Sequence, residues 1–230
     1  MTAADPSNRR GQQRGLATRH ELLEAALREF ASVGFDAAST RAIAARAGVR
    51  QGQLTYHYET KDALWRATVD HLFQRFDAEF TAALGADAAS DDPAVAFEAS
   101  VRALVRAVST MPELNRVMVH EATADSDRLT WIVDTHVRRR FEQLSGLWTR
   151  VRAAGATHLQ ADPVVMYYCV LGAASLLYVN APEARRLTGA AASTSITDEL
   201  VTAHADVLVA MMLGPRTAPA ATPRTKKKGS

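Results

Sequence analysis

The sequence has one cysteine, no long hydrophobic run and little sign of β-strands, and each scarcity excludes a class of protein. A lone Cys169 rules out an internal disulfide and a zinc site made of cysteines alone. No apolar run approaches the roughly 18 residues that indicate a membrane span, and residues 1–15 lack the hydrophobic region of a signal peptide. We therefore expect a protein of the reducing cytoplasm. Cys169 is expected to be a small buried apolar residue, with a redox-sensing thiol as the alternative.

Residues typical of β-strands are scattered rather than alternating, whereas Ala, Arg, Leu and Glu dominate the composition. This pattern predicts an all-α protein. Catalytic and cofactor motifs are also scarce. The seven histidines show no H-E-x-x-H spacing, and the sequence contains no G-x-S-x-G, P-loop or G-x-G-x-x-G motif. We therefore predict that the chain is not an enzyme and has neither a cofactor nor a metal site.

The net charge of +2 conceals an uneven distribution along the chain. Residues 1–65 hold nine Lys and Arg against seven Asp and Glu, and residues 214–230 hold five basic residues and no acid. The stretch between them has 13 basic and 18 acidic residues. Basic ends on an acidic body indicate a polyanionic partner. The lysines of the Pro- and Ala-rich tail are equally consistent with a solvated run that has no function.

Helical periodicity and capping signals divide the chain into four parts. We predict a disordered basic arm at 1–14, a first domain at 15–65, a second domain at 66–213 and a disordered basic tail at 214–230. Helices in the first domain are expected from Thr18 to Gly34, from Ser39 or Thr40 to Gly48, and over 51–57. A long fourth helix, 61–84, joins the two domains. Further helices are predicted at about 93–109, 113–121, 127–153, 162–180 and 197–213, with a loop of about fifteen residues after Asn180.

The stretch TRAIAARAGVRQGQLTYHYETK, residues 40–61, carries the most information about function. Two short helices separated by a tight glycine-containing turn predict a helix-turn-helix unit. The second of these helices is rich in Gln and Tyr, and Leu54 is its one strongly apolar residue. In such a unit the second helix enters the major groove of DNA, where Gln reads adenine and Arg reads guanine. The sequence therefore predicts a DNA-reading helix that Leu54 anchors to the core.

The same stretch resembles the tetracycline-repressor (TetR) family of bacterial regulators. The pattern T-x-x-I-A-x-x-A-G-V is present, followed by further residues in the family's register. The likeness covers about residues 18–65 and is met by Thr40, Ile43, Ala44, Ala47, Gly48, Val49, Gly52, Leu54, His57, Lys61 and Leu64. The resemblance implies an all-α homodimer with an N-terminal DNA-binding domain and a C-terminal domain for dimerisation and ligand binding. The ligand of such a protein releases the DNA.

The resemblance also assigns DNA contacts to positions of this chain. Thr40 and Lys61 correspond to phosphate-binding positions at helix starts, where the helix dipole favours anions. The full set of implied DNA-binding residues is Thr40, Arg41, Arg50, Gln51, Gln53, Thr55, Tyr56, His57 and Lys61. The chain departs from the family at Thr55, where a phosphate-binding Tyr is usual, and at Arg50 and Tyr58. Packing of Tyr56 and His57 against the first helix, and a merely solvated Lys61, are the alternatives.

The C-terminal half gives weaker indications of a ligand pocket and a dimer interface. Residues that could line a pocket between helices are Met118, His120, Trp131, Phe141, Tyr167 and Tyr168, with ordinary core packing as the alternative for each. Small residues at 172–175 let a neighbouring helix approach closely. We predict a four-helix dimer interface that includes Ala174, Ser175, Tyr178, His204, Leu208, Met211 and Met212, with burial inside one chain as the alternative.

These observations predict a homodimeric regulator that binds a palindromic operator in double-stranded DNA and responds to a small molecule. We expect a repressor. Two alternatives remain: an activator of the same fold, and an all-α small-molecule-binding or enzymatic protein that has lost DNA binding. The sequence does not identify the ligand, the operator or the regulated genes.

Overall fold

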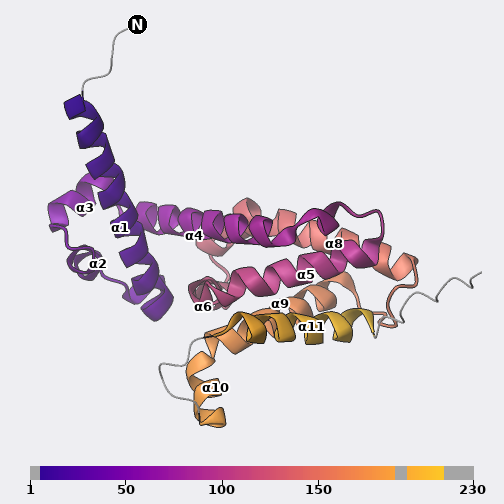
Figure 1. Cartoon of the computed structure of the whole chain (residues 1–230). Helices are drawn as coiled ribbons and strands as arrows, with labels where there is room; N and C mark the ends of the chain where they lie inside the picture. Colours follow the sequence, from indigo (N-terminus) through magenta and orange to yellow (C-terminus); the bar gives the residue numbers. More distant parts are fainter. Residues whose placement is uncertain (1–5, 190–195, 215–230) are drawn as a thin grey trace, which may run out of the picture.

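The computed structural model describes residues 6–189 and 196–214 of the chain, and their side chains from residue 15 onward. All regular elements of these ranges are helices (Figure 1). They are α1 (Pro6–Ala37), α2 (Thr40–Arg46), α3 (Gln51–His57), α4 (Lys61–Leu84), η1 (Ala86–Ala89), α5 (Pro93–Ser109), α6 (Pro112–Ala122), α7 (Asp127–Ile132), η2 (Val133–Val137), α8 (Arg138–Ala153), α9 (Pro163–Val179), α10 (Ala181–Thr188) and α11 (Asp198–Leu213). The predicted all-α fold is confirmed.

Local capping explains where the N-terminal helices begin and end. The Ser39 hydroxyl accepts a hydrogen bond from the Ala42 N–H at 3.4 Å, so Ser39 rather than Thr40 caps α2. Gly48 has φ +68°, a left-handed conformation that costs glycine little, and it turns the chain sharply into α3. Thr60 caps α4 through the Ala63 N–H at 3.0 Å. The two caps and the glycine turn therefore fix the start of α2, the turn into α3 and the start of α4.

The long helix α4 connects the three-helix N-terminal unit to the C-terminal bundle (Figure 1). It packs against α1, through contacts that extend to His71 and Arg75, and also against α5. Helix α5 is the centre of the bundle, because it also packs against α8, α9 and α11. Its Phe97, Val101 and Val105 are fully buried, and each such side chain contributes about 1.5–3 kcal/mol of hydrophobic burial.

The structure corrects several sequence predictions. Helix α1 begins at Pro6, so the predicted arm 1–14 is helical from there on; its Arg- and Gln-rich sequence suits a helix. The helix predicted at 127–153 is continuous over these residues, but it contains a π-helical turn, η2, between α7 and α8. The predicted loop after Asn180 contains α10, whose Pro182 lies in the first turn, where proline is tolerated, and whose end is marked by Gly189. Cys169 is exposed rather than buried.

Parts of both predicted disordered segments fall outside the described residues. These parts are residues 1–5 of the arm and 215–230 of the tail. Among the described helices, none is by itself long and apolar enough to cross a membrane. Helices α9 and α10 reach that length and composition only as a pair, and they are bent by 67° at their junction.

Candidate nucleic-acid interface

Helix α3 has one buried anchor and an otherwise exposed surface. Leu54 is its buried residue, with 2% of its surface exposed. Gln51, Gln53 and Thr55 are exposed, and 86% of the Tyr56 surface is accessible. A large aromatic side chain held out in water does nothing for the core, so this helix carries side chains suited to a partner.

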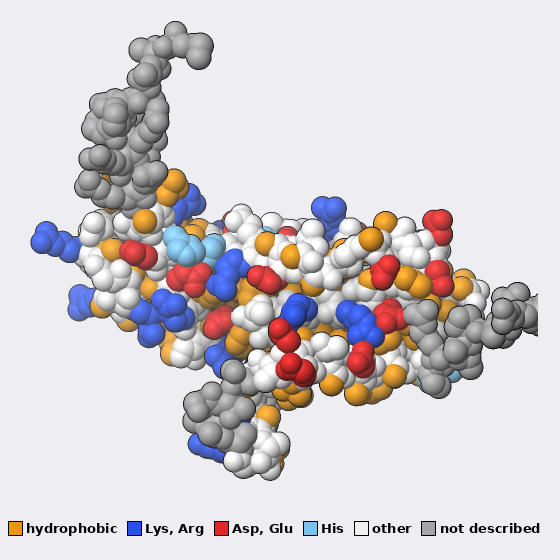
Figure 2. All heavy atoms as spheres, in the orientation of Figure 1, with side chains coloured by type: hydrophobic (Ala, Val, Ile, Leu, Met, Phe, Trp, Pro, Cys, Tyr) orange, Lys and Arg blue, Asp and Glu red, His pale blue; other side chains and the backbone are white. Residues whose placement is uncertain are grey.

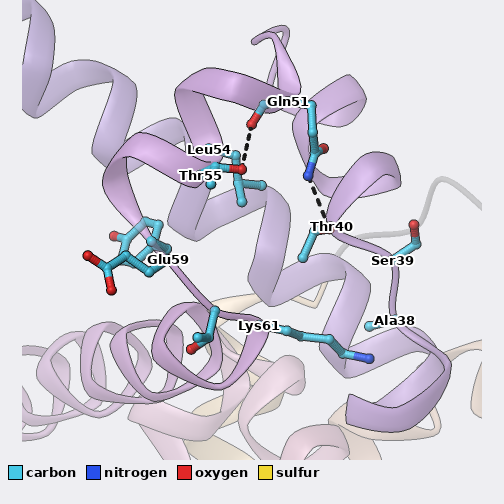
Figure 3. Close-up of a pocket in the computed structure, with 10 residues that line it drawn as sticks. Ala38, Ser39, Thr40, Gln51, Leu54, Thr55, Glu59 and Lys61 are labelled. Carbon is cyan, nitrogen blue, oxygen red and sulfur yellow. Dashed lines mark hydrogen bonds between the residues drawn. The ribbon is translucent and has the colours of Figure 1, made fainter.

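Hydrogen bonds position the polar side chains of α3. Gln51 Nε2 donates to Thr40 Oγ1 at 3.2 Å and so ties α3 to the start of α2 (Figure 3). Gln53 Oε1 accepts from the Arg50 N–H at 3.1 Å, which satisfies a backbone donor at the start of α3. Thr55 Oγ1 donates to the carbonyl oxygen of Gln51 at 3.2 Å. These hydrogen bonds therefore fix the orientation of the polar side chains on the surface of α3.

An open hollow of about 490 Å³ lies between the starts of α2, α3 and α4 (Figure 3). Four of the predicted DNA-binding residues line it together with residues that the sequence analysis did not assign. The lining is Ala38, Ser39, Thr40, Gln51, Leu54, Thr55, Tyr58, Glu59, Thr60 and Lys61. The hollow thus adds Ser39 and Thr60, whose roles as helix caps were the available signal. Free N–H groups at the starts of α2 and α4 make this region suitable for an anion.

Lys61 makes contacts that the sequence did not predict. Its Nζ donates to the carbonyl oxygen of Asp36 at 3.1 Å and lies 4.6 Å from the centroid of the Phe35 ring. The ammonium therefore caps the end of α1 and stacks on an aromatic face. The remaining predicted DNA-binding residues are Arg41 and Arg50, which are exposed, and His57, which is half-buried with its ring 5.5 Å from that of Tyr56.

A buried ion pair between α6 and α7 lies against Phe35 of α1, beside Lys61. Glu121, in α6, is 4% exposed, and its Oε2 accepts from Arg128 Nε of α7 at 2.9 Å. The Arg128 guanidinium lies 4.0 Å from the centroid of the Phe35 ring. Phe35 therefore meets two cations, one from α4 and one from α7. The sequence signal for this contact was the adjacent polar pair of His120 and Glu121 after the apolar residues 117–119.

The six predicted ligand residues belong to separate contacts. Trp131 packs against Trp65, with ring centroids 5.6 Å apart, and against His136. Phe141 and Tyr167 meet edge to face at 5.2 Å between α8 and α9, next to an exposed Tyr168. The other two are Met118, half-buried against the core, and His120, exposed beside Gly34 of α1. Burial raises the pKa of Tyr167, as expected for a phenol in an apolar contact.

The dimer residues predicted from the sequence mostly face the interior of the chain. Ala174, Ser175, Tyr178, Leu208 and Met212 are each at most 5% exposed. Ser175 Oγ accepts from Asn115 of α6, and Tyr178 Oη pairs with His204 Nδ1 at 2.9 Å within the chain. Of the predicted set, Met211 is clearly exposed, at 60%.

A different face of α9 and α11 is apolar and exposed. The two helices pack against each other. Hydrophobic side chains follow the lower edge of the molecule at the position of α11 (Figures 1 and 2). The exposed apolar or small residues on the two helices include Val165, Tyr168, Cys169, Gly172, Leu176, Leu200, Val207 and Met211. Sequence periodicity could not select this face, because α9 is apolar almost all round.

Comparisons with known proteins agree with this architecture. Residues 22–68 match the family of bacterial regulatory proteins described as the tetR family. No curated protein matches the chain significantly. The structure of AibR with isovaleryl coenzyme A and operator DNA has a TM-score of 0.66 and 20% identity, and the match covers 86% of this chain and 100% of AibR.

Two further solved structures share the fold. A TetR-like transcriptional regulator from Rhodococcus sp. RHA1 has a TM-score of 0.57 and 21% identity over 84% of this chain and 92% of that one. HlyIIR, a hemolysin II transcriptional regulator, has a TM-score of 0.60 and 17% identity over 86% of this chain and 98% of its own. Residues 22–68 thus match the tetR family of bacterial regulatory proteins, and the chain shares its fold with these solved structures.

Proposed function

We propose that this chain is a homodimeric transcriptional repressor that binds an operator in double-stranded DNA and leaves it when a small molecule binds. The observation that carries the proposal is α3, anchored by Leu54 and presenting a Tyr56 that is 86% exposed. AibR, which has the same fold, was crystallised with operator DNA, and this complex supports the same kind of partner here.

The chemistry of the surface suits DNA in two ways. Gln51 and Gln53 offer paired donors and acceptors that match adenine, and Arg50 matches guanine. Phosphate contacts fall to Thr40, to Lys61 and to the N–H groups at the start of α4. Arg41, Thr55 and His57 complete the proposed interface as backbone contacts.

The test is operator binding by single-site variants. Tyr56→Ala is expected to weaken specific binding by about 1–3 kcal/mol and to change non-specific binding much less, if the ring contacts bases. The same loss is expected for Gln53→Ala. Gln143→Ala is the matched control for Gln53, because Gln143 is an exposed glutamine on α8. A folded Gln53/Tyr56 double variant with wild-type operator affinity would contradict the assignment of α3.

The dimer is proposed to form through the exposed face of α9 and α11 rather than through the residues predicted from the sequence. Leu176 and Met211 are 59% and 60% exposed on that face. A second copy would bury both faces in a four-helix arrangement. To enter successive major grooves, the two copies of α3 in such a dimer must lie about 34–36 Å apart.

A charge placed on this face tests the dimer. Leu176→Glu is expected to give monomers in analytical ultracentrifugation and to weaken operator binding. Leu187→Glu is the control, because Leu187 is 81% exposed but lies on α10. A Leu176→Glu variant that remains dimeric would place the interface elsewhere.

The small-molecule response is proposed to involve the C-terminal helices, where Phe141 and Tyr167 meet between α8 and α9. To switch the population from almost all bound to almost none, a ligand must prefer the released state by about 5.5 kcal/mol. Isovaleryl coenzyme A, which AibR binds, is the first probe to test against the operator complex. An operator complex unaffected by saturating probe would assign the ligand to another class. Reporter expression that falls on deletion of the gene would indicate an activator.

A further inference from the structure

We propose a divalent transition-metal site formed by His20, Glu24 and His71 where α1 meets α4. One ligand atom from each side chain lies within 4.8 Å of the other two. His20 and Glu24 are one helical turn apart on α1, and His71 comes from the middle of α4. Histidine side chains lie beside acidic and basic ones at this junction on the surface in Figure 2.

The donor set and its dimensions suit a metal ion of the zinc type. Two imidazole nitrogens and one carboxylate oxygen are ligands that Zn²⁺ and similar ions accept. With metal–ligand bonds of about 2.0–2.2 Å, tetrahedral ligand atoms lie about 3.3 Å apart. Glu24 Oε1 and His71 Nε2 are already 2.9 Å apart. Because His20 is exposed, its imidazole is free to rotate and close the remaining distance.

A carboxyl ligand of a metal must be ionised, and a neighbouring cation favours the ionised form of the Glu24 carboxylate. Arg75 Nη1 lies 2.9 Å from Glu24 Oε1. Glu24 is half-buried and His71 is similarly placed, whereas His20 lies at the surface. The exposed side gives an ion an entry path and leaves coordination positions for water.

Two arginines compete with the metal for Glu24. Arg75 Nη1 lies 2.9 Å from Oε1, and Arg28 Nη1 lies 4.0 Å from Oε2. A metal ion takes Oε1, and the arginines then share Oε2 as outer partners of the ligand. These positive charges weaken the site compared with an isolated two-histidine, one-carboxylate set, so we expect moderate rather than very tight binding.

A metal ion in this position ties α1 to α4. Since α1 also packs against α6, a bound ion would stabilise the packing of the N-terminal unit against the bundle. The sequence could not show the site, because His71 lies 51 residues beyond His20 and approaches it only when α1 packs on α4.

The test is titration of the untagged full chain with Zn²⁺ in a calorimeter at neutral pH. The wild-type chain is expected to bind one ion, and His20→Ala to bind it at least about tenfold more weakly. His20 is exposed, so this variant keeps the Glu24–His71–Arg75 contacts and its fold. His158→Ala is the control, because it removes another exposed histidine, between α8 and α9.

A second variant and a second readout complete the test. Glu24→Gln keeps the side-chain volume but removes the anionic ligand, and it is also expected to lose the ion. Zn²⁺ is expected to raise the thermal midpoint of the wild type and of His158→Ala, but not that of His20→Ala. Absence of binding in the wild type, or equal affinity in wild type and His20→Ala, would overturn the site. None of these readouts involves DNA, so they test the metal site independently of the proposed repressor function.

Discussion

Replacing Arg128 tests how much its contacts between the N-terminal unit and the bundle contribute to stability. Its Nε donates to Glu121 Oε2 at 2.9 Å, and its guanidinium lies 4.0 Å from the centroid of the Phe35 ring and 5.8 Å from that of Trp65. The Glu121 side chain is 4% exposed and that of Arg128 is 24% exposed. Arg128→Ala would leave a buried carboxylate without its partner.

The expected loss follows from these contacts. Removing one partner of a buried ion pair costs about 3–5 kcal/mol, and the partial exposure of Arg128 favours the lower end. The cation–π contact with Phe35 adds about 0.5–1 kcal/mol. We therefore expect a loss of about 3.5–4 kcal/mol in the free energy of unfolding. For a chain of this size that corresponds to a fall of about 7–16 °C in the thermal midpoint.

Urea unfolding of a small set of variants measures this loss. Arg138→Ala is the matched control, because it breaks an exposed Arg–Asp pair and should leave stability unchanged. In a Glu121→Gln background the cost of Arg128→Ala should shrink, since no charge is left unpaired. A cost of Arg128→Ala no greater than that of Arg138→Ala, or one that is the same in both backgrounds, would refute the role of the unpaired charge.

Three further predictions concern stability. Leu54→Ala, which empties the buried anchor of α3, should cost about 2–5 kcal/mol in urea unfolding, whereas Thr55→Ala beside it should cost far less. Burial raises the pKa of Tyr178 to about 12, against an opposing effect of Arg106, so the fold keeps this phenol neutral. Its stabilising contribution is complete below pH ~10 and is lost as the pH rises toward 12, which Tyr178→Phe should abolish in alkaline unfolding. Burial lowers the pKa of His136 despite the charge of Asp70. The stability that neutral His136 provides should therefore fall as the pH drops below about 6.5, and His136→Phe should reduce that fall.

Helices with strong local signals could be predicted from the sequence. The predicted limits 51–57, 61–84 and 93–109 are those of α3, α4 and α5. Helices α4 and α5 start beside a polar cap, and α3 follows the glycine turn that ends α2. The same local pattern predicts which side of α3 is buried, since Leu54 is its one strongly apolar residue among polar ones.

Side-chain contacts between distant parts of the chain could not be predicted in this way. Helix α9 is apolar on nearly every side, so its periodicity does not separate the face that meets α5 from the face left exposed. The small-residue run therefore predicts Ala174 and Ser175 at a dimer interface, although they are at most 2% exposed within the chain. The histidine spacing is uninformative for a related reason, because His20 and His71 meet only after α1 and α4 pack.

Lys61 belongs both to the proposed DNA interface and to the contacts around Phe35, where α1 meets the bundle. Its ammonium already caps the carbonyl of Asp36 and faces the Phe35 ring, while the same residue lines the hollow proposed for a phosphate. A phosphate that draws Lys61 outward removes one of the two cations at Phe35 and leaves Arg128 as the other. Under the proposed function, DNA binding and the packing of Phe35 are therefore coupled through one side chain. Because such coupling is reciprocal, a change at Arg128 should alter operator affinity as well as stability, without touching the DNA.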